Sequence, residues 1–322
     1  MTTNLRGGLT VDGVPVMGNG IWTGKTYFVK PYSGNDENKG TEVDFSFKTL
    51  AKAKQVAEAD KNDRVFLISE SNTSSLTTDY QSSALDWNKD GVSLVGVGSG
   101  SFLGQRARIS NLSTATAIVD GLFRVTADNC MIANIGLFQG QGGTNPTGAS
   151  IAMTVSGERN LITGCQISGI GHSELDDATS RSLKVSGGEN TFDNCYIGLD
   201  TTIRATATAE VEVSAGARNT FNDCLINSYT SLSTFKGLTC GTPDRFVWLK
   251  DTTINAVQGI TSAVAPTGAI ASGSINGQVI LTGSSAVVGY ANVTTADDTK
   301  VYVSAPAGGL VDMGLATTVD IA

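Results

Sequence analysis

The chain has 322 residues, a net charge of −8 and a pI near 4.7. It contains 38 glycines, and Ser, Thr, Asn, Val and Ile are frequent while Lys, Glu and Leu are sparse, which argues against a mainly helical protein and favours short strands joined by tight turns. The acidic balance, without clustered Lys and Arg, argues against a nucleic-acid-binding surface, and it disfavours a polyanionic polysaccharide substrate unless a local basic groove exists.

The chain begins with a glycine-rich arm, which we assign to residues 1–24. Residues 1–8 contain no apolar run of signal-peptide length, and no later stretch reaches the ~20 apolar residues of a membrane span. We therefore expect a soluble protein that is made in a cytoplasm.

A first strand and a helix are predicted within residues 25–64. The segment FSFKTLAKAKQVAEADKND (45–63) has helical periodicity, with Leu50, Ala53, Val56 and Ala57 on one face. A helix here would cover the open end of the first coil, because solenoids need caps over exposed strand edges. Residues 63–69 and 91–100 are predicted strands, and the polar stretch 71–86 between them is predicted to loop out.

An internal repeat of about 30 residues dominates the middle of the chain. Four segments align at 130–137, 161–167, 191–197 and 220–226, and a weaker fifth covers 248–254. The alignment gives one apolar column of Ile132, Ile162, Phe192, Phe221 and Leu249; a second of Ile135, Cys165, Cys195, Cys224 and Thr252; a third of Leu137, Ile167, Ile197, Ile226 and Ile254; a fourth of Val125, Val155, Val185 and Val213; and a polar ladder of Asn160, Asn190 and Asn219.

Another column interrupts the alternation of apolar and polar residues, and it holds Asn134, Gly164, Asn194, Asp223 and Asp251. These residue types tolerate a left-handed backbone, so one residue can turn a sharp corner between two strands. Stacked strands with matching side chains at ~4.8 Å spacing predict an all-β parallel β-helix over residues 65–289. An antiparallel sandwich would not keep five columns in register.

Longer connections and a tail complete the pattern. We expect excursions at 136–152 and 172–181, which together with 71–86 would gather on one side of the solenoid. Residues 290–322 are predicted to form a short C-terminal β segment. The five cysteines lack a C-x-x-C pair and are odd in number, so buried, reduced thiols are expected rather than disulfides or a metal site.

The segment YFVKPYSGNDENKGTEVDFSFKTLAKAKQVAEA (27–59) resembles the opening of many right-handed parallel β-helix proteins of the pectate-lyase-like superfamily. The matching features are a strand, the turn Gly34–Asp36 with Gly40, and a helix motif at Phe47, Thr49, Leu50 and Ala53. MTTNLRGGLTVDGVPVMGNG (1–20) resembles the start of bacteriophage virion proteins. This resemblance implies attachment to other virion proteins, in a capsid or tail, or exchange between subunits through the arm, and side-by-side association as a homotrimer.

Candidate functional residues are few. His172, Glu174, Asp176, Asp177 and Arg181 form the densest polar cluster, which is more often a solvated loop than a site. Asp193 is the single acid of a predicted outward column with Asn222 and Lys250, and the conformational tolerance of Asp223 and Asp251 already explains those two acids. Trp22, Trp87 and Trp248 are scattered and form no predicted aromatic ladder. We therefore assign no catalytic, cofactor-binding or metal-ligating residue.

Two functions remain open. The first is a non-enzymatic bacteriophage virion protein, a capsid decoration or tail accessory subunit located in the virion, with its loops available for contact with glycans. The second is a tailspike-like polysaccharide depolymerase or lyase acting on bacterial surface glycans, with Asp176, Asp177 or Asp193 as its acids. A bacterial surface adhesin is disfavoured because no signal sequence is recognised.

Overall fold

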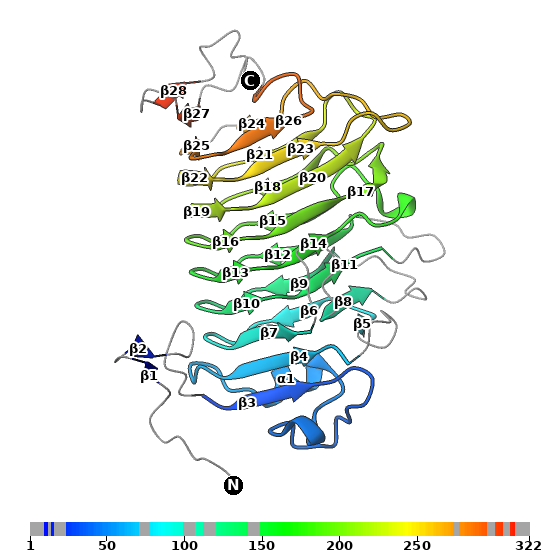
Figure 1. The fold of residues 1–322 in the computed structure, drawn as a ribbon, viewed down its shortest axis with the longest axis vertical. Coiled ribbons are helices and arrows are strands. Elements are labelled where there is room, and N and C mark those ends of the chain that lie inside the picture. The colour runs from blue at the N-terminus through cyan, green and yellow to red at the C-terminus, as the bar shows by residue number, and fades with distance from the viewer. Residues whose placement is uncertain are drawn as a thin grey trace.

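The computed structural model describes residues 24–70, 78–98, 107–111, 120–140, 149–272, 277–294 and 300–304, together with the backbone of short strands at 10–11, 14–15 and 310–312. The strands stack into an elongated rod, from β3 at one end to β27 at the other (Figure 1). Each coil from β4 to β24 contributes one strand to each of three sheets, and the end coils contribute fewer. The parallel β-solenoid predicted from the repeat is therefore confirmed, while its right-handed winding stays a prediction from the resemblance.

The three sheets are built as follows. Sheet 1 contains β3 (Thr26–Val29), β4 (Arg64–Ile68), β7 (Ser93–Val97), β10 (Met131–Ala133), β13 (Leu161–Thr163), β16 (Thr191–Asp193), β19 (Ala217–Asn222), β22 (Asp244–Lys250), β25 (Gln278–Thr282), β27 (Val301–Ser304) and β28 (Leu310–Asp312). Sheet 2 contains β5 (Thr78–Gln81), β8 (Arg108–Asn111), β11 (Gly136–Phe138), β14 (Gln166–Ser168), β17 (Tyr196–Arg204), β20 (Leu225–Thr230), β23 (Thr253–Ala256) and β26 (Ala286–Val288). Sheet 3 contains β6 (Leu85–Trp87), β9 (Asp120–Val125), β12 (Ile151–Val155), β15 (Arg181–Val185), β18 (Ala209–Val213), β21 (Lys236–Cys240) and β24 (Ile270–Ser272).

Neighbouring strands in these sheets are parallel, except that β28 runs antiparallel to β27. A separate antiparallel pair is formed by β1 (Thr10–Val11) and β2 (Val14–Pro15). The register matches the sequence alignment: Ile132 pairs with Ile162, and Phe192 pairs with Phe221. The two phenyl rings stack with centroids 4.7 Å apart inside the coil. Like residues therefore lie over like residues along one continuous apolar core.

The corner between sheets 1 and 2 is turned by single residues in the left-handed region, as predicted. The φ angles are 55° at Asn134, 62° at Gly164, 50° at Asn194, 49° at Asp223 and 51° at Asp251. A second left-handed column, which the alignment does not predict, lies at the corner between sheets 3 and 1. It contains Asn129, Arg159, Glu189, Arg218 and Arg245. The ion pairs of Glu189 with Arg159 and with Arg218, both at 2.8 Å, link three of these exposed side chains.

The helix expected over 45–63 is wrong in its bounds. A 3₁₀ turn, η1, covers Val43–Phe45, and the helix α1 covers only Leu50–Val56 beside β3 and β4. The Thr49 side chain accepts a hydrogen bond from the Lys52 backbone and caps its start. Ala57 is already extended, and the positive φ of Asp60 and Asn62 turns the chain toward β4. Val56 is 36% exposed instead of sharing the buried face.

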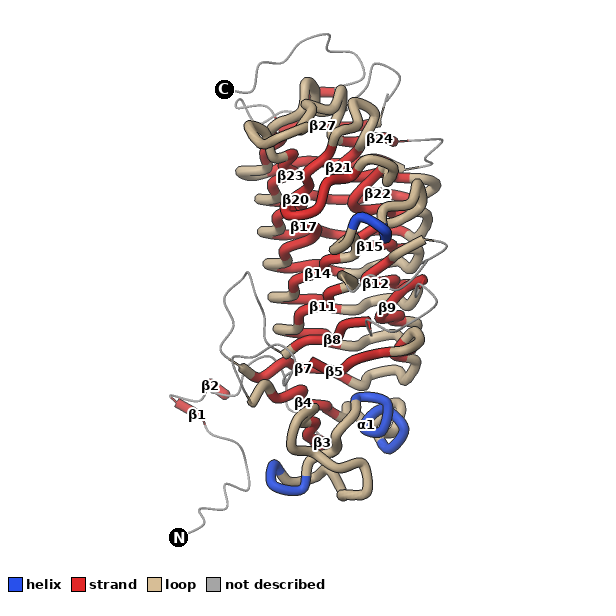
Figure 2. The backbone as a smooth tube through the Cα atoms, turned by 90° about the vertical axis from the view of Figure 1, so that its right-hand side faces the viewer, coloured by secondary structure: helices blue, strands red, loops and turns tan. Residues whose placement is uncertain are grey.

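The loop expected over 71–86 is wrong in its second half, because β5 and β6 lie there; residues 71–77 are outside the described part. The polar residues Thr78 and Asp79 are buried in β5, so the usual apolar signal of a strand is missing. The excursion 136–152 contains β11 and the first residues of β12, with 141–148 outside the described residues. This excursion and 172–181 both connect sheet 2 to sheet 3, so these two do share one corner (Figure 2).

Candidate functional site

The polar cluster at 172–181 lies at the corner where chains leave sheet 2 and enter sheet 3. Its first half folds into a 3₁₀ turn, η2 (Ser173–Leu175), seen as a short blue segment beside β15 in Figure 2. The Nδ1 of His172 accepts a hydrogen bond from the Glu174 backbone N–H at 3.2 Å and caps this turn. Leu175 is buried beneath it. The one histidine of the chain therefore has a local structural role.

Asp176 holds the next connection of the same corner. One carboxylate oxygen accepts the backbone N–H groups of Ala205 (2.7 Å) and Thr206 (2.9 Å), and the other accepts that of Ala207 (2.8 Å). Three N–H donors converging on one carboxylate form a strong, charge-assisted clamp. Asp176 therefore ties the loop after β17 to the loop of the preceding coil.

Asp177 closes a tight turn within its own loop. Its Oδ1 accepts the backbone N–H of Thr179 at 2.9 Å and the Thr179 hydroxyl at 2.8 Å. These hydrogen bonds lower the pKa of the Asp177 carboxyl. This is the local bonding that favours aspartate in turns.

Arg181 begins β15 and is mostly buried. Its guanidinium donates to the carbonyl oxygens of Ala178 (3.0 Å) and Ser180 (2.7 Å) and to the Thr208 hydroxyl (3.1 Å). Its Nε lies 3.2 Å from a Glu212 oxygen as an ion pair without hydrogen-bond alignment. Burial lowers the pKa of Arg181, and the charge of Glu212 opposes that effect.

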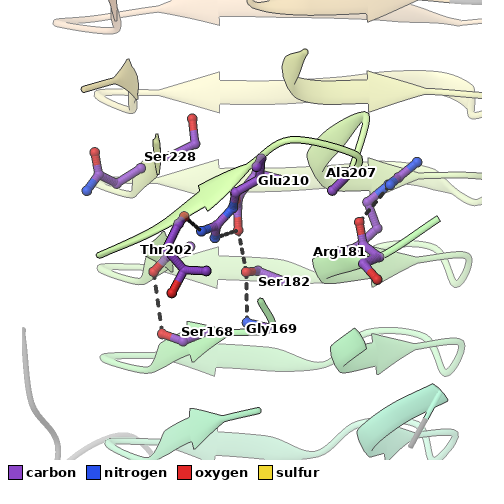
Figure 3. Close-up of polar contacts among 12 residues, drawn as sticks. Ser168, Gly169, Arg181, Ser182, Thr202, Ala207, Glu210 and Ser228 are labelled. Atoms are coloured by element: carbon purple, nitrogen blue, oxygen red, sulfur yellow. Dashed lines mark hydrogen bonds and ion pairs between the residues drawn. The ribbon is translucent and has the colours of Figure 1, made fainter. Parts of the chain in front are cut away.

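A fully buried ion pair, which the sequence pattern does not reveal, links β17 and β18 at the same corner. Figure 3 shows Glu210 of this pair with Ser182 and Gly169. The guanidinium of Arg204 donates to both carboxylate oxygens of Glu210, at 3.0 Å from Nε and 2.9 Å from Nη2, and both side chains have no exposed surface. The Ser182 hydroxyl also donates to Glu210, and the Gly169 N–H donates to Ser182 at 2.9 Å. The pair thus joins β17, β18 and β15.

The remaining candidate acids lie elsewhere. Asp193 is on the outer side of sheet 1, where it accepts the Thr163 hydroxyl at 3.2 Å, so the fold does not bring it together with Asp176 and Asp177. Asp223 and Asp251 occupy the left-handed corner column, and Asp251 also accepts the Ser284 N–H at 2.7 Å.

The tryptophans also differ in position. Trp87 is fully buried and donates to the carbonyl oxygen of Val92 at 2.7 Å. Trp248 is 38% exposed on the outer side of sheet 1. Trp22 lies outside the described residues.

A shallow basic depression of about 630 Å³ lies beside α1, lined by Lys52, Lys54, Lys89 and Asp36 among others. Lys89 is engaged there, because its ammonium donates to the carbonyl oxygens of Gln55 (3.0 Å) and Ala57 near the end of α1. In the part of the chain that the structure describes, no three His, Cys, Asp or Glu side chains gather as metal ligands. Within the same residues, no helix combines the length and apolar character needed to cross a membrane.

Known proteins resemble this chain only in structure. No protein-family model and no curated protein matches the sequence. A pectin methylesterase variant solved with a hexasaccharide aligns with 91% of this chain and 93% of its own at 13% identity and a TM-score of 0.49. A pectate lyase aligns over 93% and 82% at 12% identity and a TM-score of 0.49. The pectin methylesterase of Aspergillus niger aligns over 92% and 95% at 14% identity and a TM-score of 0.46.

Proposed function

We propose that the chain is a non-enzymatic structural subunit of a bacteriophage particle, a capsid decoration or tail accessory protein that assembles as a homotrimer. In this proposal residues 1–24 attach the rod to other virion proteins, α1 covers the first coil, and the coils wind in the right-handed sense. The single observation that supports a structural role is the bonding of the densest acidic loop: both oxygens of the Asp176 carboxylate accept backbone N–H groups, three in all.

The hydrogen bonding of these carboxylates favours a structural role over a catalytic one. A general acid or nucleophile must present an oxygen to the substrate, whereas Asp176 uses both oxygens to hold the 205–207 loop. Asp177 similarly bonds Thr179, and Asp86 forms two hydrogen bonds with Arg124 on the outer side of sheet 3. The bonds of Asp176 and Asp86 join successive coils and stiffen the rod, whereas those of Asp177 hold its own loop.

The first test places the protein in the particle. Phage particles should be purified from the host strain that encodes the chain and analysed by mass spectrometry and cryo-electron microscopy. We expect the rod at a fixed position and in multiples of three copies per attachment site. Its absence from purified particles would contradict the proposal.

The second test concerns turnover. The purified protein, incubated with capsular polysaccharide and lipopolysaccharide of the same host, should release no reducing ends. Release by the wild type, lost in the double variant Asp176→Asn/Asp177→Asn but kept in the matched surface variant Asp60→Asn, would instead establish the depolymerase function.

A further inference from the structure

Two rows of side chains point outward from sheet 1 along most of the rod. The hydrogen-bonded register builds one row from Thr26, Arg64, Ser93, Met131, Leu161, Thr191, Thr220, Trp248, Ile280 and Tyr302. It builds the other from Phe28, Phe66, Val95, Ala133, Thr163, Asp193, Asn222, Lys250 and Thr282. We call these two rows the sheet 1 outer face.

The sheet 1 outer face is rich in aromatic side chains compared with the chain as a whole, and among its residues Ser93 and Ala133 are buried. Phe28 and Phe66 stack with centroids 5.7 Å apart at one end. Trp248, 38% exposed, meets the edge of the Phe246 ring at 6.3 Å near the other end. Aromatic side chains and Met are enriched in interface cores, and the two rows contain Phe28, Phe66, Trp248, Tyr302 and Met131. In the two rows, charge is carried by Arg64, Asp193 and Lys250 alone.

The outward row of sheet 3 shows what a solvated face of the same rod looks like. In that row Asp86 pairs with Arg124, and Lys184 pairs with Glu212 at 3.4 Å. Thr154 and Ala271 occupy the same row. The two faces are built from the same repeat and differ in their share of charged side chains, which is larger in the sheet 3 row.

The dimensions of the face identify the class of partner. At ~4.8 Å per strand, ten strands give a strip roughly 45 Å long, and two rows of side chains make it roughly 15 Å wide. That is on the order of 700 Å², close to the ~800 Å² that each partner contributes to a standard protein interface. A partner must be equally long and flat, and a second copy of the rod meets both requirements.

We propose that the sheet 1 outer face is the self-association surface of this protein, buried against the same face of other copies around the symmetry axis of the oligomer. The inference deepens the proposed function, because it rests on the trimeric subunit and names the surface that makes it. The side of the rod that carries sheet 3 and the polar cluster at 172–181 then faces solvent or other virion components.

Sedimentation of the full chain tests this surface. The wild type should sediment as an oligomer at micromolar concentration. The variant Leu161→Glu/Ile280→Glu places unpaired carboxylates on the face and should weaken association on the order of 100-fold or more. The matched control Thr154→Glu/Ala271→Glu adds the same charge to sheet 3 and should sediment like the wild type. Circular dichroism establishes that each variant is folded.

A covalent measurement covers the case in which the Glu variant fails to fold. The variant Thr220→Cys introduces a thiol at the middle of the face, whereas the native cysteines are buried. A short bis-maleimide should link Thr220→Cys subunits into covalent dimers and leave a Thr154→Cys variant unlinked.

The outcomes separate the surface from the function. A monomeric wild type overturns both this surface and the trimer, while its presence in particles would still support a virion role. An oligomer that survives the Glu substitutions, or that Thr154→Cys links and Thr220→Cys does not, overturns the surface alone. If an arm of residues 1–23 covers the face within one chain, the wild type is a monomer and the proposal fails.

Discussion

The side-chain oxygen of Asn190 accepts a hydrogen bond from the backbone N–H of Asn160, one coil earlier, at 3.0 Å. The Asn190 amide also donates to the carbonyl oxygen of Gly157 at 3.0 Å, and the side chain is fully buried. Asn160 and Asn219 each make the same two hydrogen bonds, one accepted and one donated, with backbone groups of the preceding coil. The ladder therefore satisfies backbone groups that the turn between sheets 3 and 1 leaves without strand partners.

Asn190→Ala should lower the free energy of unfolding by roughly 2–5 kcal/mol, because it leaves one buried N–H and one buried carbonyl without partners. The measurement is urea unfolding followed by circular dichroism. The control Thr191→Ala changes the next, outward-facing side chain and should stay within about 0.5 kcal/mol of the wild type. Equal effects of the two substitutions would contradict the role of the ladder.

Breaking the buried ion pair should cost more than removing it. Glu210→Met leaves the Arg204 guanidinium buried without a counter-ion and should destabilise the rod by about 3–5 kcal/mol. The double variant Arg204→Met/Glu210→Met removes both charges and should recover part of that loss. A double variant that is less stable than the single one would contradict this expectation.

Stability should fall as pH rises toward neutrality because of Asp79. Burial raises the pKa of this carboxyl from 3.8 to about 7, while the Leu50 N–H and the Gln81 amide donate to it. Between pH 3.8 and about 7, the Asp79 carboxyl is therefore protonated in the folded state and ionised in the unfolded chain. The contribution of Asp79 to the free energy of unfolding is therefore largest below pH 4, declines as pH rises to about 7 and is lost above that. The total change is about 4 kcal/mol. Chemical unfolding across pH 4–8 should show this slope, and Asp79→Asn should flatten it.

All five cysteines should resist thiol reagents in the native protein. They are buried and unpaired, and burial raises the pKa of Cys130 to about 12 and that of Cys165 well above its usual value. A colorimetric thiol assay should find no fast-reacting group until denaturant is added, and then five. The Thr220→Cys variant supplies the positive control with one accessible thiol. A fast-reacting native cysteine would contradict the inward row.

The core was predictable because it is periodic. Stacking puts Cys165, Cys195 and Cys224 in one inward row, where each thiol donates to a backbone carbonyl of the preceding coil. The same repetition placed Asn194 and its equivalents at the corner, since a single left-handed residue leaves a clear signature of Asn, Gly and Asp. A column of this kind can be predicted from the sequence repeat without knowing the long-range contacts.

The contacts around the polar cluster at 172–181 were not predictable in the same way. The clamp of Asp176 on Ala205–Ala207 and the pairing of Arg204 with Glu210 depend on how two unequal loops meet in space. The second corner column has no clear sequence signature, because Arg159, Glu189 and Arg218 are unusual in a left-handed backbone. β5 lacks the apolar pattern that predicts a strand, because its buried residues Thr78 and Asp79 are polar.

The register gives this molecule an adjustable length. Asn160 precedes Leu161 as Asn190 precedes Thr191, and Leu161 pairs directly with Thr191. Deleting residues 161–190 would therefore join Asn160 to Thr191 and preserve each stack of side chains, while shortening the rod by one strand spacing, ~4.8 Å. Duplication or loss of whole coils in the gene would in this way change the length of the rod in fixed steps, without any change to the packing of the core.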